Sequence, residues 1–136
     1  MPQRRKRVLC ADAEEDICEV ISGLLSRRGF EVVTVHSLIS AHLIAQGQAF
    51  DVYVIDGQFW GDVGTAFCKS IRYFDPLSPV VIFSSAEGES ARREALSAGA
   101  TRYVLKPDIE GLIEAVGQVT SVVPLGVVES GSGRRA

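Results

Sequence analysis

Short apolar runs alternate with amphipathic stretches along most of this 136-residue chain, and that alternation restricts its fold more than any other feature. The apolar runs are rich in β-branched residues and are bounded by polar or turn residues, a pattern typical of buried strands. They predict strands over residues 8–11, 32–35, 52–55, 80–83 and 103–105.

The stretches between these runs show helical spacing. Ile17, Val20, Ile21, Leu24 and Leu25 recur at i, i+3, i+4, i+7 and i+8, and Gly29 follows as a C-terminal stop. The other helices are expected over residues 37–45 with Ser37 as N-cap and a stop at Gly47, around Phe67, Ile71 and Phe74 with a stop before Pro76, over residues 89–98 closed by Gly99, and over residues 109–116.

A strand–helix unit repeated five times predicts an α/β fold, a three-layer sandwich of a parallel sheet with helices on both faces. The runs at 52–55 and 80–83 are almost wholly apolar, as burial on both faces requires. The second and fifth runs carry Glu31, Thr34 and Arg102, which suits the edges of the sheet.

Length and charge narrow the class of protein. One domain is expected from 136 residues, and a net charge of −3 disfavours direct binding to nucleic acid. No apolar run approaches the roughly 20 residues of a membrane span, and no signal peptide is visible, so we expect a cytoplasmic protein without a membrane partner.

Three cysteines, Cys10, Cys18 and Cys68, lack the spacing of a zinc site or a disulfide framework, and we interpret them as small core residues. His36 and His42 have no second ligand at metal-binding spacing, which favours surface or packing roles.

The chain divides into three parts by composition. Residues 1–6 form a basic arm that we expect to be solvated together with Arg7, residues 7–122 form the domain, and residues 123–136 form a flexible tail or the start of a linker.

Polar residues stand at the carboxyl ends of four predicted strands. Asp12 follows the first strand, Asp56 the third, Ser84 and Ser85 the fourth, and Lys106 the fifth. Because ligands of open parallel sheets gather at that edge, we expect these side chains to converge. Each acid taken alone is equally consistent with a helix cap, but independent caps would not supply the lysine.

These residue types suit phosphoryl chemistry. Two neighbouring carboxylates repel each other unless a hard cation such as Mg²⁺ lies between them. A carboxylate beside that cation can attack phosphorus and become an aspartyl phosphate, which a lysine and a hydroxyl would then bind.

The sequence resembles the receiver domain of two-component response regulators over about residues 7–122. The resemblance rests on residues 8–17, which include Asp12, on residues 52–56, on residues 81–86, and most specifically on residues 99–107, together with Gly61 and Gly64. It implies a flavodoxin-like (βα)5 fold with strand order 2-1-3-4-5.

The resemblance also implies a role for each matching residue. Asp56 would accept phosphate from a histidine kinase or phosphotransfer protein, and Lys106, followed by a cis peptide bond to Pro107, would bind the phosphoryl group. Mg²⁺ would be held by Asp12, Asp56 and the backbone carbonyl of Gln58. Ser85 and Tyr103 would form the conformational switch. The output face, from Glu89 to Val122, would bind a downstream protein or a second copy of the chain.

Several residues depart from the family pattern. Ala13 replaces a second acid that normally ligates Mg²⁺, so metal affinity should fall, and Gly57 and Trp60 replace an apolar residue and a proline. Trp60 could act as a partner anchor or as a lid. These changes support an alternative, a degenerate receiver that binds a protein partner without phosphorylation.

Enzyme functions fit the residues less well. A phosphohydrolase would need a second aspartate where Glu14 stands, and a nucleotide or flavin domain would need a glycine-rich turn after the first strand. We therefore expect no enzyme, beyond self-directed phosphotransfer and autodephosphorylation.

Overall fold

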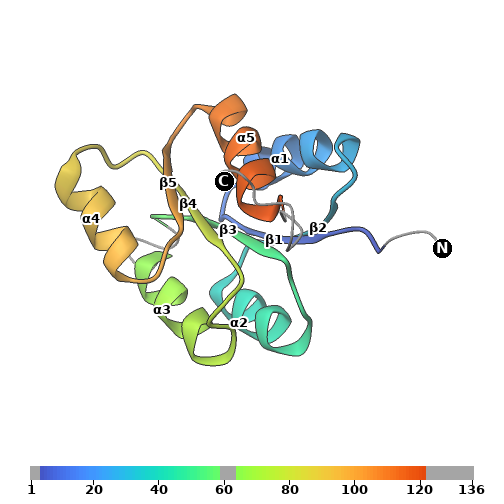
Figure 1. Cartoon of the computed structure of the whole chain (residues 1–136), viewed down its shortest axis with the longest axis horizontal. Coiled ribbons are helices and arrows are strands. Elements are labelled where there is room, and N and C mark those ends of the chain that lie inside the picture. The colour runs from blue at the N-terminus through green and yellow to red at the C-terminus, as the bar shows by residue number, and fades with distance from the viewer. Residues whose placement is uncertain (1–3, 59–63, 122–136) are drawn as a thin grey trace, which may run out of the picture.

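The computed structural model describes residues 4–58 and 64–121, in which five strands alternate with five helices along the chain (Figure 1). The strands are β1 (Arg7–Ala11), β2 (Glu31–Val35), β3 (Val52–Asp56), β4 (Val80–Ser84) and β5 (Arg102–Leu105). The helices are α1 (Glu15–Arg27), α2 (Leu38–Gly47), α3 (Gly64–Phe74), α4 (Glu89–Ser97) and α5 (Ile109–Thr120). Each predicted strand and helix is present.

The strands form one parallel sheet in the order β2-β1-β3-β4-β5, which confirms the fold implied by the resemblance. Val8 of β1 lies opposite Val32 of β2 on one side and Val52 of β3 on the other. Every residue of β3 and β4 is buried, whereas β2 and β5 keep exposed or half-buried positions, as their polar residues predicted.

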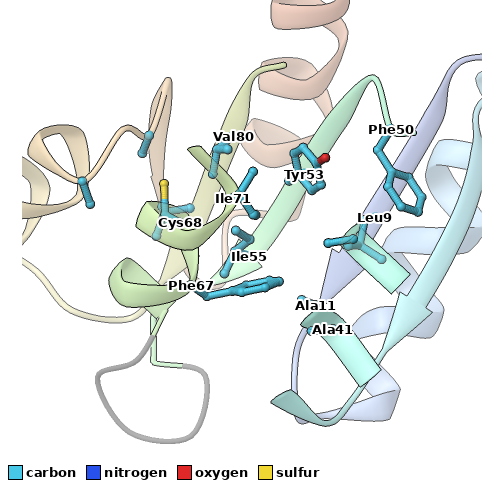
Figure 2. Packing of buried hydrophobic residues seen from close by; sticks show 14 of the residues in the cluster. Leu9, Ala11, Ala41, Phe50, Tyr53, Ile55, Phe67, Cys68, Ile71 and Val80 are labelled. Atoms are coloured by element: carbon cyan, nitrogen blue, oxygen red, sulfur yellow. The ribbon is translucent and has the colours of Figure 1, made fainter. Parts of the chain in front are cut away.

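Alternate side chains of each strand enter two separate cores. One core lies against α2, α3 and α4, where Phe67 and Ile71 of α3 pack on Tyr53 and Ile55 of β3 (Figure 2). The other lies against α1 and α5, on the opposite side of the sheet (Figure 1). The strands are therefore buried on both faces, which fixes their carboxyl ends at one edge of the sheet.

The expected caps are also present. The Ser37 hydroxyl accepts a hydrogen bond from the Ser40 N–H at 3.1 Å and begins α2. Gly29 and Gly99 follow α1 and α4 with φ angles of 92° and 111°, a region that glycine adopts without steric cost. Helix α5 runs to Thr120, four residues beyond its last marker in the sequence, Val116.

The described part of the basic segment before β1 has exposed Arg4 and Arg5 side chains, as a solvated arm should, but it also contacts the domain. Arg4 pairs with Asp51 at 3.1 Å, and the Lys6 ammonium donates to the Thr120 carbonyl. The guanidinium of Arg7 lies 4.8 Å from the centre of the Phe50 ring. Residues 4–7 are therefore attached to the domain, because acceptors from distant loops meet them at the amino end of the sheet. The predicted tail and Trp60 lie outside the described residues.

The cysteines and His42 have the packing roles that the sequence predicts. All three cysteines are free and buried, and the His42 ring packs edge-on against Phe67 with 4.9 Å between ring centres. Within the described ranges, none of the helices has the length and apolar character needed to span a bilayer.

Candidate functional site at the carboxyl edge of the sheet

Three strand ends bring two carboxylates and an ammonium group together. Lys106 Nζ lies 3.2 Å from Asp12 Oδ2 and 3.2 Å from Asp56 Oδ1. Asp12 follows β1, Asp56 ends β3 and Lys106 follows β5, so residues up to 94 positions apart in the chain meet at one edge. This convergence is what the positions of the three residues predicted.

Burial and backbone hydrogen bonds hold the two acids in place. Asp12 is 2% exposed and Asp56 is 7% exposed. The Glu14 N–H donates to Asp12 Oδ1 at 2.9 Å, and the Gln58 N–H donates to Asp56 Oδ1 at 3.0 Å. Each carboxylate is therefore fixed both by the turn that follows it and by the shared lysine.

Burial and the neighbouring charges shift the pKa values of Asp12 and Lys106. Burial raises the pKa of Asp12 and the neighbouring Asp56 charge adds to the rise, although the Glu14 N–H and Lys106 act in the opposite direction. Burial alone would lower the pKa of Lys106, but the charges of Asp56 and Asp12 outweigh it and raise that pKa. The lysine therefore stays charged between two acids, one of which is destabilised as an anion.

The peptide bond between Lys106 and Pro107 is cis, as the resemblance implies. The Lys106 N–H donates to the Ser84 carbonyl at 2.8 Å, which continues the β4–β5 pairing one residue beyond β5. The Lys106 ammonium group lies over the Phe83 ring, with 5.7 Å between Nζ and the ring centre. Lys106 is thereby directed toward the two acids.

The two switch residues lie beside this cluster and contact other groups. The exposed Ser85 hydroxyl donates to Gln58 Oε1 at 2.5 Å, and the Ser85 N–H donates to the same oxygen at 3.2 Å. The half-buried Tyr103 donates its hydroxyl hydrogen to the Ala86 carbonyl at 2.6 Å. The structure thus places Ser85 against the Gln58 side chain, a contact between two loops that the sequence analysis missed and that no local pattern signals.

Gly57 has a steric reason to be glycine. A Cβ atom at this position would lie 2.7 Å from Ser84 Cβ and 2.8 Å from Ser84 Oγ. The Gly57 N–H also donates to the Phe83 carbonyl at 3.1 Å, which holds the turn against β4. The glycine is required by this close approach, whereas the sequence showed only that it departs from the family pattern.

His36 is a further residue of the site. Its Nδ1 donates to the Asp12 carbonyl at 3.0 Å, and this hydrogen bond raises the pKa of the imidazole. The sequence predicts only a surface or packing role for His36. The hydrogen bond to Asp12 could not be predicted, because it joins the ends of two adjacent strands and has no sequence signature. His36 supports the backbone of the residue that carries one of the carboxylates.

The donor atoms of the cluster suit a hard cation but form an incomplete set. Asp12 and Asp56 supply carboxylate oxygens, which Mg²⁺ prefers, and Mg²⁺ commonly keeps several waters. Ala13 is exposed and supplies no oxygen. Over residues 4–58 and 64–121, no group of three or more His, Cys, Asp or Glu side chains is arranged to hold a metal ion. The two carboxylates therefore have the chemistry that Mg²⁺ prefers, but they do not by themselves complete its coordination.

Comparison with known proteins identifies a sequence family. The profile described as "Response regulator receiver domain" matches residues 8–117. The alginate biosynthesis transcriptional regulatory protein AlgB of Pseudomonas putida is 30% identical over 101 residues, which cover 74% of this chain and 22% of AlgB. The nisin biosynthesis regulatory protein NisR of Lactococcus lactis is 30% identical over 102 residues, which cover 74% of this chain and 44% of NisR. The chain thus matches less than half the length of these relatives.

Solved structures share the fold. The Francisella response regulator 1452 receiver domain is 26% identical with a TM-score of 0.78, and the match covers 85% of this chain and 96% of that one. A response regulator from Thermotoga maritima has a TM-score of 0.79 at 22% identity, over 88% of this chain and all of the other. Both structures therefore share the fold of this chain over most of its length.

Proposed function

The chain belongs to the response regulator receiver domain family, and on that basis we propose that it is a phospho-accepting switch of a two-component or phosphorelay system. The cluster of Asp12, Asp56 and Lys106, with each acid 3.2 Å from the lysine, carries this proposal. A buried anion beside a fixed cation is the arrangement that phosphoryl transfer to a carboxylate needs.

Asp56 is the proposed nucleophile. One of its carboxylate oxygens attacks phosphorus, the P–N bond of a phosphohistidine or the P–O bond of an acyl phosphate breaks, and the donor leaves with the bonding electron pair. Mg²⁺, when bound, would offset negative charge on the phosphoryl oxygens. Lys106, 14% exposed as a side chain, needs only to turn from Asp56 toward the new phosphoryl oxygens to form an ion pair with them.

Ser85 and Tyr103 are the proposed switch. The Ser85 hydroxyl must leave Gln58 before it can donate to a phosphoryl oxygen, and this movement would reposition the loop from Ser85 to Gly88. Tyr103 donates to Ala86 in that loop, so a change there reaches β5 directly. The proposed output face runs from Glu89 to Val122, where a downstream protein or a second copy would bind.

The proposed setting follows from the family. The phosphoryl donor would be a histidine kinase or phosphotransfer protein, and the location would be the cytoplasm. We keep the division into a basic arm (1–6), a receiver domain (7–122) and a tail or linker (123–136) as part of this proposal. The contacts of residues 4–6 would hold that part of the arm against the domain.

A degenerate receiver is the second candidate. Ala13 leaves the cation with two carboxylates, and the Lys106 ammonium already forms an ion pair with each of them. Such a site could be stable without a cation or phosphate and serve only to hold the output face in shape.

Intact-mass measurement with acetyl phosphate and Mg²⁺ tests the two candidates. We expect a Mg²⁺-dependent phosphoryl adduct in the wild-type protein and none in Asp56→Asn. Asp16→Asn, which changes an exposed acid in the first turn of α1, is the matched control and should retain the adduct. Absence of any adduct at saturating Mg²⁺, from acetyl phosphate and from a phosphorylated phosphotransfer protein alike, would establish the degenerate receiver.

The role of Ala13 has its own test. Ala13→Asp restores an acid beside Asp12, so the Mg²⁺ concentration that gives half-maximal phosphorylation should fall about tenfold or more. An unchanged Mg²⁺ requirement would mean that Ala13 does not weaken the site.

A further inference from the structure

Two cysteines lie in contact inside the core that α1 and α5 share with the sheet. Cys10 is on β1 and Cys18 is on α1, and their sulfur atoms are 3.7 Å apart. Each residue is 1% exposed. The pair brings together two nucleophilic groups that the proposed phosphoryl chemistry does not use.

A surface hollow borders one of these two cysteines. It has a volume of about 380 Å³ and lies between α1 and β2, with Cys18, Glu19, Ser22, Thr34 and His36 among its lining residues. Cys10 is not among them and lies behind Cys18 as seen from the hollow. A small polar oxidant in the hollow would therefore meet Cys18 first.

We propose that Cys10 and Cys18 are a redox-active pair, in which a hydroperoxide entering the hollow oxidises Cys18 and Cys10 then closes a disulfide. The contact between the two sulfurs, together with the hollow beside only one of them, carries this proposal. It does not depend on phosphorylation of Asp56. In a reducing compartment such a disulfide would be transient, as redox-sensing disulfides are.

The chemistry balances in two steps. The Cys18 sulfur attacks one oxygen of hydrogen peroxide, the O–O bond breaks, and the departing hydroxide takes the thiol proton as water, which leaves a sulfenic acid. The Cys10 sulfur then attacks Cys18, the S–O bond breaks, and a second water leaves with the Cys10 proton. The two thiols lose two electrons in total, and the peroxide gains them. The sulfurs must approach from 3.7 Å to a bonded separation of about 2.05 Å.

Two other uses of the pair are less consistent with its surroundings. Metal binding would need further ligands, and the described part of the chain contains no cluster of three or more His, Cys, Asp or Glu side chains able to hold a metal ion. Simple core packing explains burial, but it gives no reason for a polar hollow to border one thiol of a touching pair.

Oxidation of the cysteine pair would change the hydrogen bonds of Asp12, one of the two acids that contact Lys106. The Cys18 thiol lies 3.8 Å from the Asp12 carbonyl as a weak donor, and His36 donates to the same oxygen. A disulfide removes the thiol hydrogen, so the Asp12 carbonyl would keep only the histidine of these two donors.

The test exposes the folded full chain to millimolar hydrogen peroxide and measures intact mass without reductant. We expect the loss of two hydrogen atoms, a Cys10–Cys18 peptide cross-link on digestion, and reversal by dithiothreitol. Cys68→Ala is the matched control, because Cys68 is also buried but lies in the opposite core beside Phe67 and Ile71 (Figure 2), and it should leave the cross-link unchanged.

Single variants separate the two roles. Cys10→Ala should accumulate a sulfenic acid on Cys18 that dimedone captures, whereas Cys18→Ala should leave Cys10 unmodified, with circular dichroism showing that both remain folded. Retention of the starting mass, oxygen addition without a cross-link, or a cross-link through Cys68 would each overturn the proposal. So would a cross-link that forms only above the urea concentration at which the chain unfolds.

Discussion

The edge of the sheet contains two groups of residues that differ in how they are held. We call Asp12, Asp56 and Lys106 the ionic half, and Gln58, Ser85 and Tyr103 the hydroxyl half. In the ionic half the two acids are buried and both pair with the half-buried Lys106, whereas Ser85 in the hydroxyl half is exposed and hydrogen-bonded across loops. The first is fixed because its members stand at strand ends, and the second can change partners at little cost because water competes for its hydrogen bonds.

This difference suits a switch. A buried charge cluster provides a constant electrostatic environment, while weak loop contacts provide the part that moves. Gly57 joins the halves, since it lies between Asp56 and Gln58 and packs against Ser84. The free energy of unfolding should therefore depend strongly on the ionic half and only slightly on the hydroxyl half.

Removal of the lysine should have the largest effect. Lys106→Met leaves two buried carboxylates without their cation, and we expect the free energy of unfolding in metal-free buffer to fall by about 3 kcal/mol. Urea denaturation followed by circular dichroism measures it. Lys69→Met, at an exposed position of α3, is the control and should change stability by less than about 0.5 kcal/mol. Equal effects of the two substitutions would show that the ionic half contributes nothing to folding.

A side chain at Gly57, the junction between the two halves, should have the next largest effect on the free energy of unfolding. Gly57→Ala places a Cβ 2.7 Å from Ser84 Cβ, so the turn or β4 must shift, at a cost of about 2 kcal/mol. Gly23→Ala is the matched control, because a Cβ there meets no atom within 4 Å and alanine favours the helix by roughly 0.5–1 kcal/mol. The same unfolding experiment should give opposite signs. A stability gain for both would mean that the junction has room to relax.

The pH dependence of the free energy of unfolding should report the cost of burying the Asp12 carboxylate. Its pKa is raised in the folded protein, so its contribution to stability is full below the ordinary value of 3.8 and is lost as pH rises through the folded pKa. Asp12→Asn removes that loss. We therefore expect the variant to be more stable than wild type at pH 7 without metal, by on the order of 1 kcal/mol, and the gain to vanish near pH 4.

Unfolding curves at several pH values in the presence of a chelator measure this difference. A variant that is less stable than wild type at pH 7 would mean that the Lys106 pair outweighs the burial of Asp12.

Loss of the hydroxyl should have the smallest effect. Ser85→Ala removes one exposed hydrogen bond to Gln58, and we expect stability to change by less than about 0.5 kcal/mol. Gln58→Ala also removes the acceptor of the Ser85 N–H, so its effect should be slightly larger but still small. A loss above about 1.5 kcal/mol in either variant would show that the hydroxyl half is as firmly held as the ionic half.

The ionic half could be predicted from the sequence because its geometry follows from the fold class. Once residues 52–55 and 80–83 are recognised as buried parallel strands, the residues that follow such strands must meet at one edge. The strand order came from the family resemblance, since hydrophobic periodicity locates strands but does not order them.

Contacts between residues of different elements or loops could not be predicted in this way. The pairing of Ser85 with Gln58, the support of Asp12 by His36 and the contact of Cys10 with Cys18 each join residues from different elements. The attachment of Arg4 to Asp51 belongs with them, because the two residues are 47 positions apart in the chain.

The sequence by itself thus determined the five strand–helix units, the buried strands and the positions of Asp12, Asp56 and Lys106, because hydrophobic period and strand ends are local properties of the chain. The tertiary structure alone decided the distances and partners: which carboxylates share the ammonium, which oxygen the Ser85 hydroxyl meets, and why residue 57 has no side chain. These depend on how two separate cores position the loops in three dimensions, and local periodicity carries no information about that packing.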